Sequence, residues 1–271
     1  MSRPPSRSLQ LSRELLRRII HRDLRPGDPI DVQALGRHHG VSRTVVREAL
    51  AELVGKGLVQ ARAKVGTTVA PESGWQRLDA DWMALALAAP DATRTLSEAA
   101  ALRRLIEPAL AAGCARNASR ESQQAVLRVV RRAAEALGAQ EAETFSRASL
   151  TLHRVLSEAC DNRLLRSIDH ALAPARSMQY AQLLQSEDAA APAQRTLARM
   201  LGLQTRLGMA VARRDPEQAA RSAQALVALT PVEPVVEPAP AAAPEDAEVW
   251  PETVTLIPAP TVIAARARAM L

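Results

Sequence analysis

The stretch Val41-Ser42-Arg43-Thr44-Val45-Val46-Arg47-Glu48-Ala49-Leu50 decides how the first part of this chain folds. Ser42 is a residue type that caps helix N-termini, and apolar residues then recur on one helix face, at Val46, Ala49, Leu50 and Leu53. Arg43, Thr44 and Arg47 fall on the opposite face, with the two arginines one helical turn apart. Such a helix end suits a phosphate or a guanine edge, because free N–H groups and guanidinium donors converge there. A solvated surface helix with two ordinary arginines explains this stretch alone equally well.

The neighbouring segments supply the context of this helix. An apolar stripe predicts a helix over residues 8–22, a Pro-Gly break follows at 25–28, and Asp31 can cap a short helix over 32–38. After Gly57, residues 58–61 and 67–70 have the composition of two strands, with a basic loop at 62–66 between them. Three helices and a hairpin in this order predict a winged helix-turn-helix with a two-stranded wing.

Charge is divided unevenly along the 271 residues. Residues 1–70 hold 13 Lys and Arg against 6 Asp and Glu, a net of +7, whereas the remainder holds 22 against 23, a net of −1. A basic unit joined to a nearly neutral larger one indicates that the first binds a polyanion and that the second has another role.

The second part of the chain is expected to be all-α. Aromatic residues make up only 2% of the chain, so its core must be built from Leu, Val, Ile and Ala. Amphipathic patterns predict six or seven helices up to about residue 229, and two of the apolar sets are Leu102, Leu105, Ile106, Leu110 and Leu164, Leu165, Ile168, Leu172. The expected fold class is therefore mainly α, an N-terminal winged helix-turn-helix followed by an all-α helical bundle.

The same patterns predict four parts: a basic winged helix-turn-helix domain at 8–70, a linker with an anchoring helix at 71–94, an all-α domain at 95–229, and a flexible Ala/Pro-rich tail at 230–271. We expect Trp75 and Trp82 to anchor the linker. The sequence contains no apolar run long enough for a bilayer and no signal peptide, which predicts a cytoplasmic protein without a membrane partner. Cys114 and Cys160 are expected to be buried free thiols.

Residues 8–70 resemble the DNA-binding domain of the GntR family of bacterial transcription regulators. The resemblance rests on the motif V-S-R-x-x-V-R-E-A-L at 41–50, followed by Gly57-Leu58-Val59 and the wing sequence at 65–69. It implies that Arg43, Thr44 and Arg47 enter the major groove of double-stranded DNA, and that Ser42 also belongs to the DNA-binding residues. Arg62, Lys64 and Gly66 of the wing would approach the DNA backbone or the minor groove. Gln33 stands where the family usually has arginine or a glutamate-arginine pair, so this contact departs from the family pattern.

The second part resembles the FadR-type ligand-binding domain, at 102–112 and again at 152–165. Most such domains hold a divalent metal through an aspartate, a histidine four residues later and two further histidines. Here His153 matches the first histidine, but the other positions fall on Ser149, on Gln204 and near Leu226. One ligand of four cannot hold a metal competitively, so we expect neither a metal nor another cofactor.

Two residues are candidates for binding a small-molecule effector, for which a carboxylate is one candidate. Arg103 is expected to point into a bundle with few other charges, where it could bind a carboxylate or instead pair with Glu107 on its own helix. His153 could contact an effector or be an ordinary core histidine. Three outcomes stay open: an effector held by polar groups, an acyl ligand in an apolar cavity, or a domain that only dimerises.

The function expected from these features is that of a homodimeric transcription regulator, more a repressor than an activator, that reads a palindromic operator and responds to an effector. The alternative is an architectural or constitutive DNA-binding dimer. We do not expect an enzyme, because no paired carboxylates, catalytic triad or phosphate-binding loop occurs at usable spacing.

Overall fold

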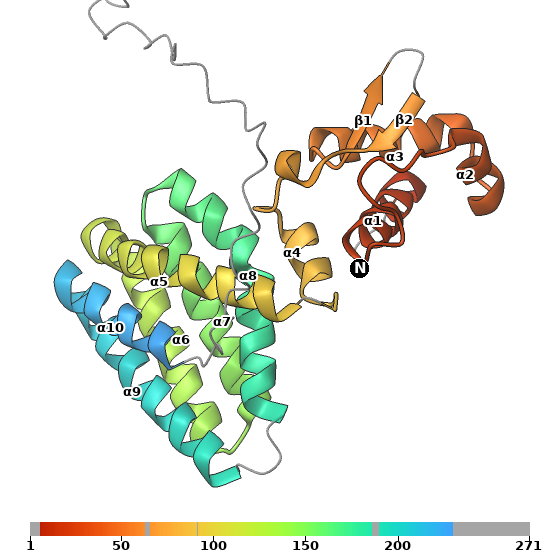
Figure 1. Ribbon diagram of the computed structural model, residues 1–271. Helices are drawn as coiled ribbons and strands as arrows, with labels where there is room; N and C mark the ends of the chain where they lie inside the picture. The colour runs from red at the N-terminus through yellow and green to blue at the C-terminus, as the bar shows by residue number, and fades with distance from the viewer. Residues whose placement is uncertain (1–5, 63–65, 91, 186–189, 230–271) are drawn as a thin grey trace, which may run out of the picture. The chain divides into compact units, whose positions relative to one another are not determined.

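A computed structural model describes residues 6–62, 66–90, 92–185 and 190–229 of the chain (Figure 1). Within these ranges the protein has ten α-helices and one two-stranded sheet, which confirms the mainly α fold class. The predicted tail at 230–271 and wing residue Lys64 lie outside the described residues.

The N-terminal unit has the order of a winged helix-turn-helix. Its elements are α1 (Arg7–Ile20), α2 (Val32–His39), α3 (Arg43–Gly55), β1 (Val59–Arg62) and β2 (Gly66–Val69). The strands pair antiparallel, in a register that runs from Val59 opposite Val69 to Arg62 opposite Gly66. The helices predicted at 8–22 and 32–38 are therefore present with boundaries shifted by one or two residues.

Side-chain caps fix where these helices begin. Ser6 accepts a hydrogen bond from the Leu9 amide at 3.2 Å, and Asp31 accepts from the Gln33 amide at 2.7 Å. Ser42 accepts from the Val45 amide at 3.4 Å, as its residue type predicts. Helix α2 ends at Gly40, whose φ of 59° lies in the left-handed region that glycine adopts without strain. The turn between α2 and α3 is thus set by the sequence locally.

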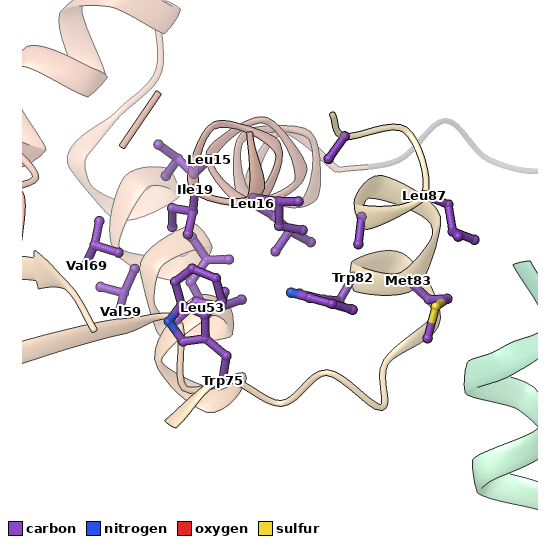
Figure 2. Close-up of a cluster of buried hydrophobic side chains, with 14 of the residues drawn as sticks. Leu15, Leu16, Ile19, Leu53, Val59, Val69, Trp75, Trp82, Met83 and Leu87 are labelled. Atoms are coloured by element: carbon purple, nitrogen blue, oxygen red, sulfur yellow. The ribbon is translucent and has the colours of Figure 1, made fainter. Parts of the chain in front are cut away.

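A continuous apolar core joins the three helices and the wing (Figure 2). It contains Leu15, Leu16 and Ile19 from α1, Leu53 from α3, and Val59 and Val69 from the strands. Trp75 is buried against this core, and its indole nitrogen donates to the Ala70 carbonyl at 3.0 Å. Trp82, in α4 (Ala80–Ala86), is buried in the same cluster. Both tryptophans therefore anchor the segment that follows the wing, as expected.

Six helices form the bundle: α5 (Ala92–Asn117), α6 (Arg120–Gly138), α7 (Ala142–Ala159), α8 (Arg163–Gln185), α9 (Ala190–Arg213) and α10 (Pro216–Ala228) (Figure 1). Helix α10 packs against α5 and α9, and α6 packs against α7 and α9. Their apolar core includes Phe145, Leu152, Met200 and Leu207, and both cysteines are buried free thiols.

Two predicted inward-facing leucines are instead exposed. Leu105 is 74% exposed and Leu164 is 78% exposed. The buried face of α5 at this level carries Arg103 and Glu107 together with Ile106. Adjacent residues differ by about 100° around a helix, so Leu105 turns away from the core when Ile106 faces it. The prediction for both leucines was wrong, and for Leu105 the reason is that it assumed an apolar inward face of α5.

Candidate DNA interface and effector site

The recognition helix α3 separates its apolar and polar residues cleanly. Val46, Ala49, Leu50 and Leu53 are buried in the core of the N-terminal unit. Ser42, Arg43, Thr44 and Arg47 are exposed on the other side. The two guanidinium groups thus leave the first turns of α3, where backbone N–H groups lack helical partners.

A groove of about 600 Å³ brings residues from four elements, α2, α3, β1 and β2, onto one concave surface. Gln33 from the first turn of α2, Arg43 and Arg47 from α3, and Thr67 from β2 all line it. Gln33, Arg43 and Arg47 are residues that the sequence assigns to DNA contact, and the structure places them together. Guanidinium, amide and hydroxyl groups supply both donors and acceptors, which is the combination that base edges in the major groove require.

The wing contributes backbone geometry as well as side chains. Arg62 ends β1 and pairs with Gly66 at the start of β2, so these two residues flank the wing tip. Gly66 has a φ of 98°, a conformation that favours glycine. Thr67 was missed by the sequence reasoning. Strand alternation places it on the same side of β2 as buried Val69, a signal that gives its side of the strand but not its place in the groove.

A chain of buried charges runs through the bundle. Arg103 in α5 donates from Nε to Glu107 Oε1 at 2.6 Å, and Arg176 in α8 donates from Nη2 to the same oxygen at 3.0 Å. Arg176 Nη2 also donates to Asp169 Oδ1 at 2.5 Å. All four side chains are buried, which corrects the expectation that Arg103 points into a bundle with few other charges. The pairing of Arg103 with Glu107, one of the two alternatives for Arg103, is present.

His153 in α7 lies at the edge of this chain, with Nδ1 3.7 Å from Glu107 Oε2. Burial lowers the pKa of His153 to about 4, and Arg176 adds to this effect, so the imidazole is neutral at pH 7. Burial alone would raise the pKa of Glu107, but His153, which is protonated at the low pH where Glu107 titrates, and the charges of Arg103 and Arg176 outweigh this effect and bring the pKa to about 2. Glu107 is therefore a carboxylate whose charge is balanced by the two arginines.

The residues at the metal-ligand positions of the FadR-type domain do not fit a metal. Gln204 in α9 donates from Nε2 to Ser149 Oγ at 2.8 Å, and Ser149 donates in turn to the Phe145 carbonyl at 2.9 Å. Leu226 is buried in the apolar core. A neutral hydroxyl, an amide and a single imidazole are a poor donor set for a divalent ion. Across the described ranges, no three His, Cys, Asp or Glu side chains are arranged to hold a metal.

Several polar atoms near the chain of buried charges are themselves buried and have no hydrogen-bond partner among the described residues. They are Arg103 Nη1, Glu107 Oε2, Ser146 Oγ, Gln204 Oε1 and both side-chain polar atoms of Gln179. Ser146, Ser149 and His153 recur on one face of α7, and Arg176, Gln179 and Tyr180 on one face of α8. Burial raises the pKa of Tyr180, whose hydroxyl is in hydrogen-bond contact with Ser149. This part of the bundle interior is thus polar, and its hydrogen-bonding groups are only partly paired.

The fold and the groove define a winged helix-turn-helix DNA-binding protein with a second, all-helical domain. Residues 7–69 match the family model described as "Bacterial regulatory proteins, gntR family", and residues 98–229 match the "FCD domain" model. The chain belongs to the GntR family of transcription regulators, with an effector-binding FCD domain, and it is not an enzyme. Within the described residues, every helix is too short or too polar to cross a bilayer.

Curated relatives include regulators of this family. The chain is 26% identical over 179 residues to the galactonate operon transcriptional repressor of Escherichia coli. The aligned region covers 65% of this chain and 76% of that protein. It is 32% identical over 149 residues to the HTH-type transcriptional regulator LutR of Bacillus subtilis, covering 54% of this chain and 64% of that protein. Among solved structures, the GntR protein of Streptococcus agalactiae matches 82% of this chain and 97% of its own, with 18% identity and a TM-score of 0.47.

Proposed function

We propose that this protein is a homodimeric repressor that binds a palindromic operator and releases it when an effector occupies the helical domain. The observation that carries the DNA-binding part is the groove shared by Gln33, Arg43, Arg47 and Thr67. In this proposal residues 8–70 form the DNA-binding domain, 71–94 the linker and anchoring helix, and 95–229 the effector and dimerisation domain. The protein acts in the cytoplasm, where its DNA target lies.

Each part of the interface has a separate task in this proposal. Arg43, Thr44 and Arg47 contact base edges in the major groove, and Ser42 places the N-terminus of α3 against a phosphate. Gln33 contacts the same groove from α2, while Arg62, Lys64 and Gly66 of the wing approach the backbone or the minor groove. Two copies related by a twofold axis would read two half-sites, since operator symmetry follows protein symmetry.

The effector is assigned to the interior of the bundle. Arg103 and His153, the two candidates from the sequence, both lie on the buried charge chain around Glu107. An effector that binds one arrangement of the dimer better than another shifts the equilibrium between them by its difference in affinity. A repressor is favoured because the E. coli relative bears that name.

A selection from random duplex DNA with the full-length protein tests the DNA-binding part. We expect an enriched sequence with twofold symmetry, bound by two protomers in a light-scattering measurement. Enrichment of no sequence would identify an architectural DNA binder instead, and enrichment of a single unrepeated half-site by a monomer would contradict the dimer. Transcription from a promoter that carries the selected site then distinguishes a repressor from an activator.

A further inference from the structure

Among the described residues, the buried charged side chains of the bundle carry no net charge. Two guanidinium groups, Arg103 and Arg176, face two carboxylates, Glu107 and Asp169. His153 adds no charge at neutral pH, because burial lowers its pKa to about 4. Each arginine is already paired with a carboxylate of the protein itself. The charges therefore compensate one another before any ligand arrives.

The atoms without a hydrogen-bond partner around the chain of buried charges form a mixed set of donors and acceptors. Arg103 Nη1 and Gln179 Nε2 are donors, Glu107 Oε2, Gln179 Oε1 and Gln204 Oε1 are acceptors, and Ser146 Oγ can be either. Gln179 and Gln204 are 2% and 1% exposed, so bulk water does not reach them. Native proteins leave few buried polar groups unpaired, because each lost hydrogen bond destabilises the fold. A group of such atoms in one interior indicates a partner that is absent from the protein chain.

We propose that the helical domain binds a small ligand of zero net charge that carries both hydroxyl or amide donors and oxygen acceptors, held by Gln179, Gln204 and Arg103. This inference rests on the proposed function, since it names the chemical class of the effector. It replaces the carboxylate considered from the sequence with an uncharged polar molecule such as a polyol or an amide.

An anionic ligand is disfavoured by the charge balance. A carboxylate placed in this interior would give a buried site of net charge −1, and a buried charge without compensation is strongly unfavourable. It would also compete with Glu107 for Arg103, whose Nε already donates to Glu107 at 2.6 Å. A neutral ligand satisfies Gln179 and Gln204 without breaking either ion pair.

A groove between α7 and α8 reaches the buried charges Asp169 and Arg176 from the surface. It has a volume of about 380 Å³, which is in the range of small-molecule sites, and Asp169 and Arg176 line it together with buried Ser157. Asp169 is the last member of the buried charge chain, and Arg176 links it to Glu107. The groove thus reaches Arg176, which lies one helical turn before Gln179 on the same face of α8.

The first arm of the test needs no ligand. Gln179→Met removes an amide that has no partner among the described residues and keeps the side-chain volume. We expect the melting temperature of the ligand-free, full-length variant to equal or exceed that of the wild type. The matched control is Gln124→Met, at an exposed amide of α6. A fall of more than about 3 °C for Gln179→Met relative to this control would show that the amide is bonded within the protein, and would overturn the proposal.

The second arm compares matched anionic and uncharged compounds: lactate with lactamide, succinate with succinamide, and galactonate with galactitol. At equal ionic strength, we expect at least one uncharged member to raise the melting temperature of the wild type by roughly 5–10 °C near 100 times its Kd. The same compound should have no such effect on Gln179→Met. Stabilisation by acids alone, or by no compound of the panel, overturns the assignment.

A DNA-binding measurement distinguishes failure of the uncharged-ligand proposal from failure of the proposed function. The same samples are titrated with the DNA selected above, and DNA binding is followed by fluorescence anisotropy. A protein that binds its operator and releases it with an acid keeps the proposed function and rejects the uncharged ligand. A protein that selects no DNA sequence rejects the proposed function, whatever the ligand panel shows.

Discussion

The side-chain amide of Gln204 in α9 donates a hydrogen bond to the hydroxyl of Ser149 in α7 at 2.8 Å. Both side chains are buried, and they stand at positions where most FadR-type domains have metal ligands. The pair links two helices through neutral groups. This helix contact therefore needs no ion.

The first prediction concerns metal content. Protein purified without chelator should contain less than about 0.1 divalent ion per protomer by elemental analysis, because the donor set is too weak. One tightly held ion per protomer would contradict this. As a matched comparison, Ser149→Asp combined with Gln204→His places a carboxylate and a second imidazole near His153, and this double variant should take up zinc.

The second prediction concerns the buried carboxylate. Glu107→Gln should lower the free energy of unfolding by roughly 3–5 kcal/mol, because it leaves two buried guanidinium groups short of a countercharge. The control is Glu143→Gln, which breaks the exposed pair with Arg147 and should change stability by less than about 1 kcal/mol. Urea unfolding measures both. Equal effects at the two positions would show that burial of the charge chain is not important for stability.

The third prediction is a pH dependence caused by His153. Its folded pKa of about 4 lies below the ordinary value of 6.5, so between these values the unfolded chain binds a proton that the folded protein does not. The contribution of His153 to the free energy of unfolding should be fully present above about pH 6.5. It should fall by on the order of 2–3 kcal/mol as the pH drops toward 4. Glu107, whose pKa falls from 4.5 to about 2, extends the loss to lower pH.

Urea unfolding at a series of pH values tests this dependence. His153→Gln should remove the slope between pH 6.5 and 4, whereas His170→Gln, at an exposed histidine of α8, should leave most of it. If the His153 variant keeps the slope of the wild type, its imidazole is not the group that titrates.

The fourth prediction concerns DNA recognition. Arg47→Ala should weaken binding to the selected operator by roughly 1–3 kcal/mol, about 5- to 150-fold, and relax discrimination at one base pair. Arg128→Ala, at an exposed arginine of α6, serves as the control and should leave the affinity unchanged. Salt titrations on specific and random DNA measure both variants. An Arg47→Ala protein that matches the wild type on both DNAs would remove α3 from the interface.

The fifth prediction concerns the turn after the recognition helix. Gly57 has a φ of 71°, and a Cβ at this position would lie 2.1 Å from the Gly74 carbonyl oxygen. Gly40 also has positive φ, at 59°, but an added Cβ there meets no atom within 4 Å. Gly40→Ala should therefore lower stability by about 1 kcal/mol and Gly57→Ala by clearly more. Thermal unfolding of both variants measures the difference, and equal losses would show that the contact with Gly74 relaxes freely.

Much of the DNA-binding unit follows from local sequence. Asp31, Ser42 and Gly40 begin or end helices by rules that involve neighbouring residues alone, and the stripe from Val46 to Leu53 fixes which side of α3 faces inward. The exposed side of α3, with Arg43 and Arg47, follows from the same periodicity. Thr67 could not be assigned in this way, because its place in the groove depends on how the wing packs against α3.

The effector domain shows where local sequence is insufficient. Its helices were predictable from apolar periodicity, yet Leu105 and Leu164 are exposed whereas Arg103 and Arg176 are buried. A charged residue is stable in a core only when a countercharge from another part of the chain meets it, and hydropathy alone does not reveal such a partner. Asp169, which shares Arg176 with Glu107, is such a residue.

The sequence by itself determined the winged helix-turn-helix and the exposed arginines of α3. It also determined that positions 149, 204 and 226 carry no strong metal ligand. These features depend on residue identity and local spacing. Only the tertiary structure decided how the residues at those positions are paired. The bond from Gln204 to Ser149 joins residues 55 positions apart, and the pairing of Arg176 with Glu107 joins residues 69 positions apart. Hydrogen bonds and ion pairs act over a few ångströms, so only the packing of the helices brings these partners within range.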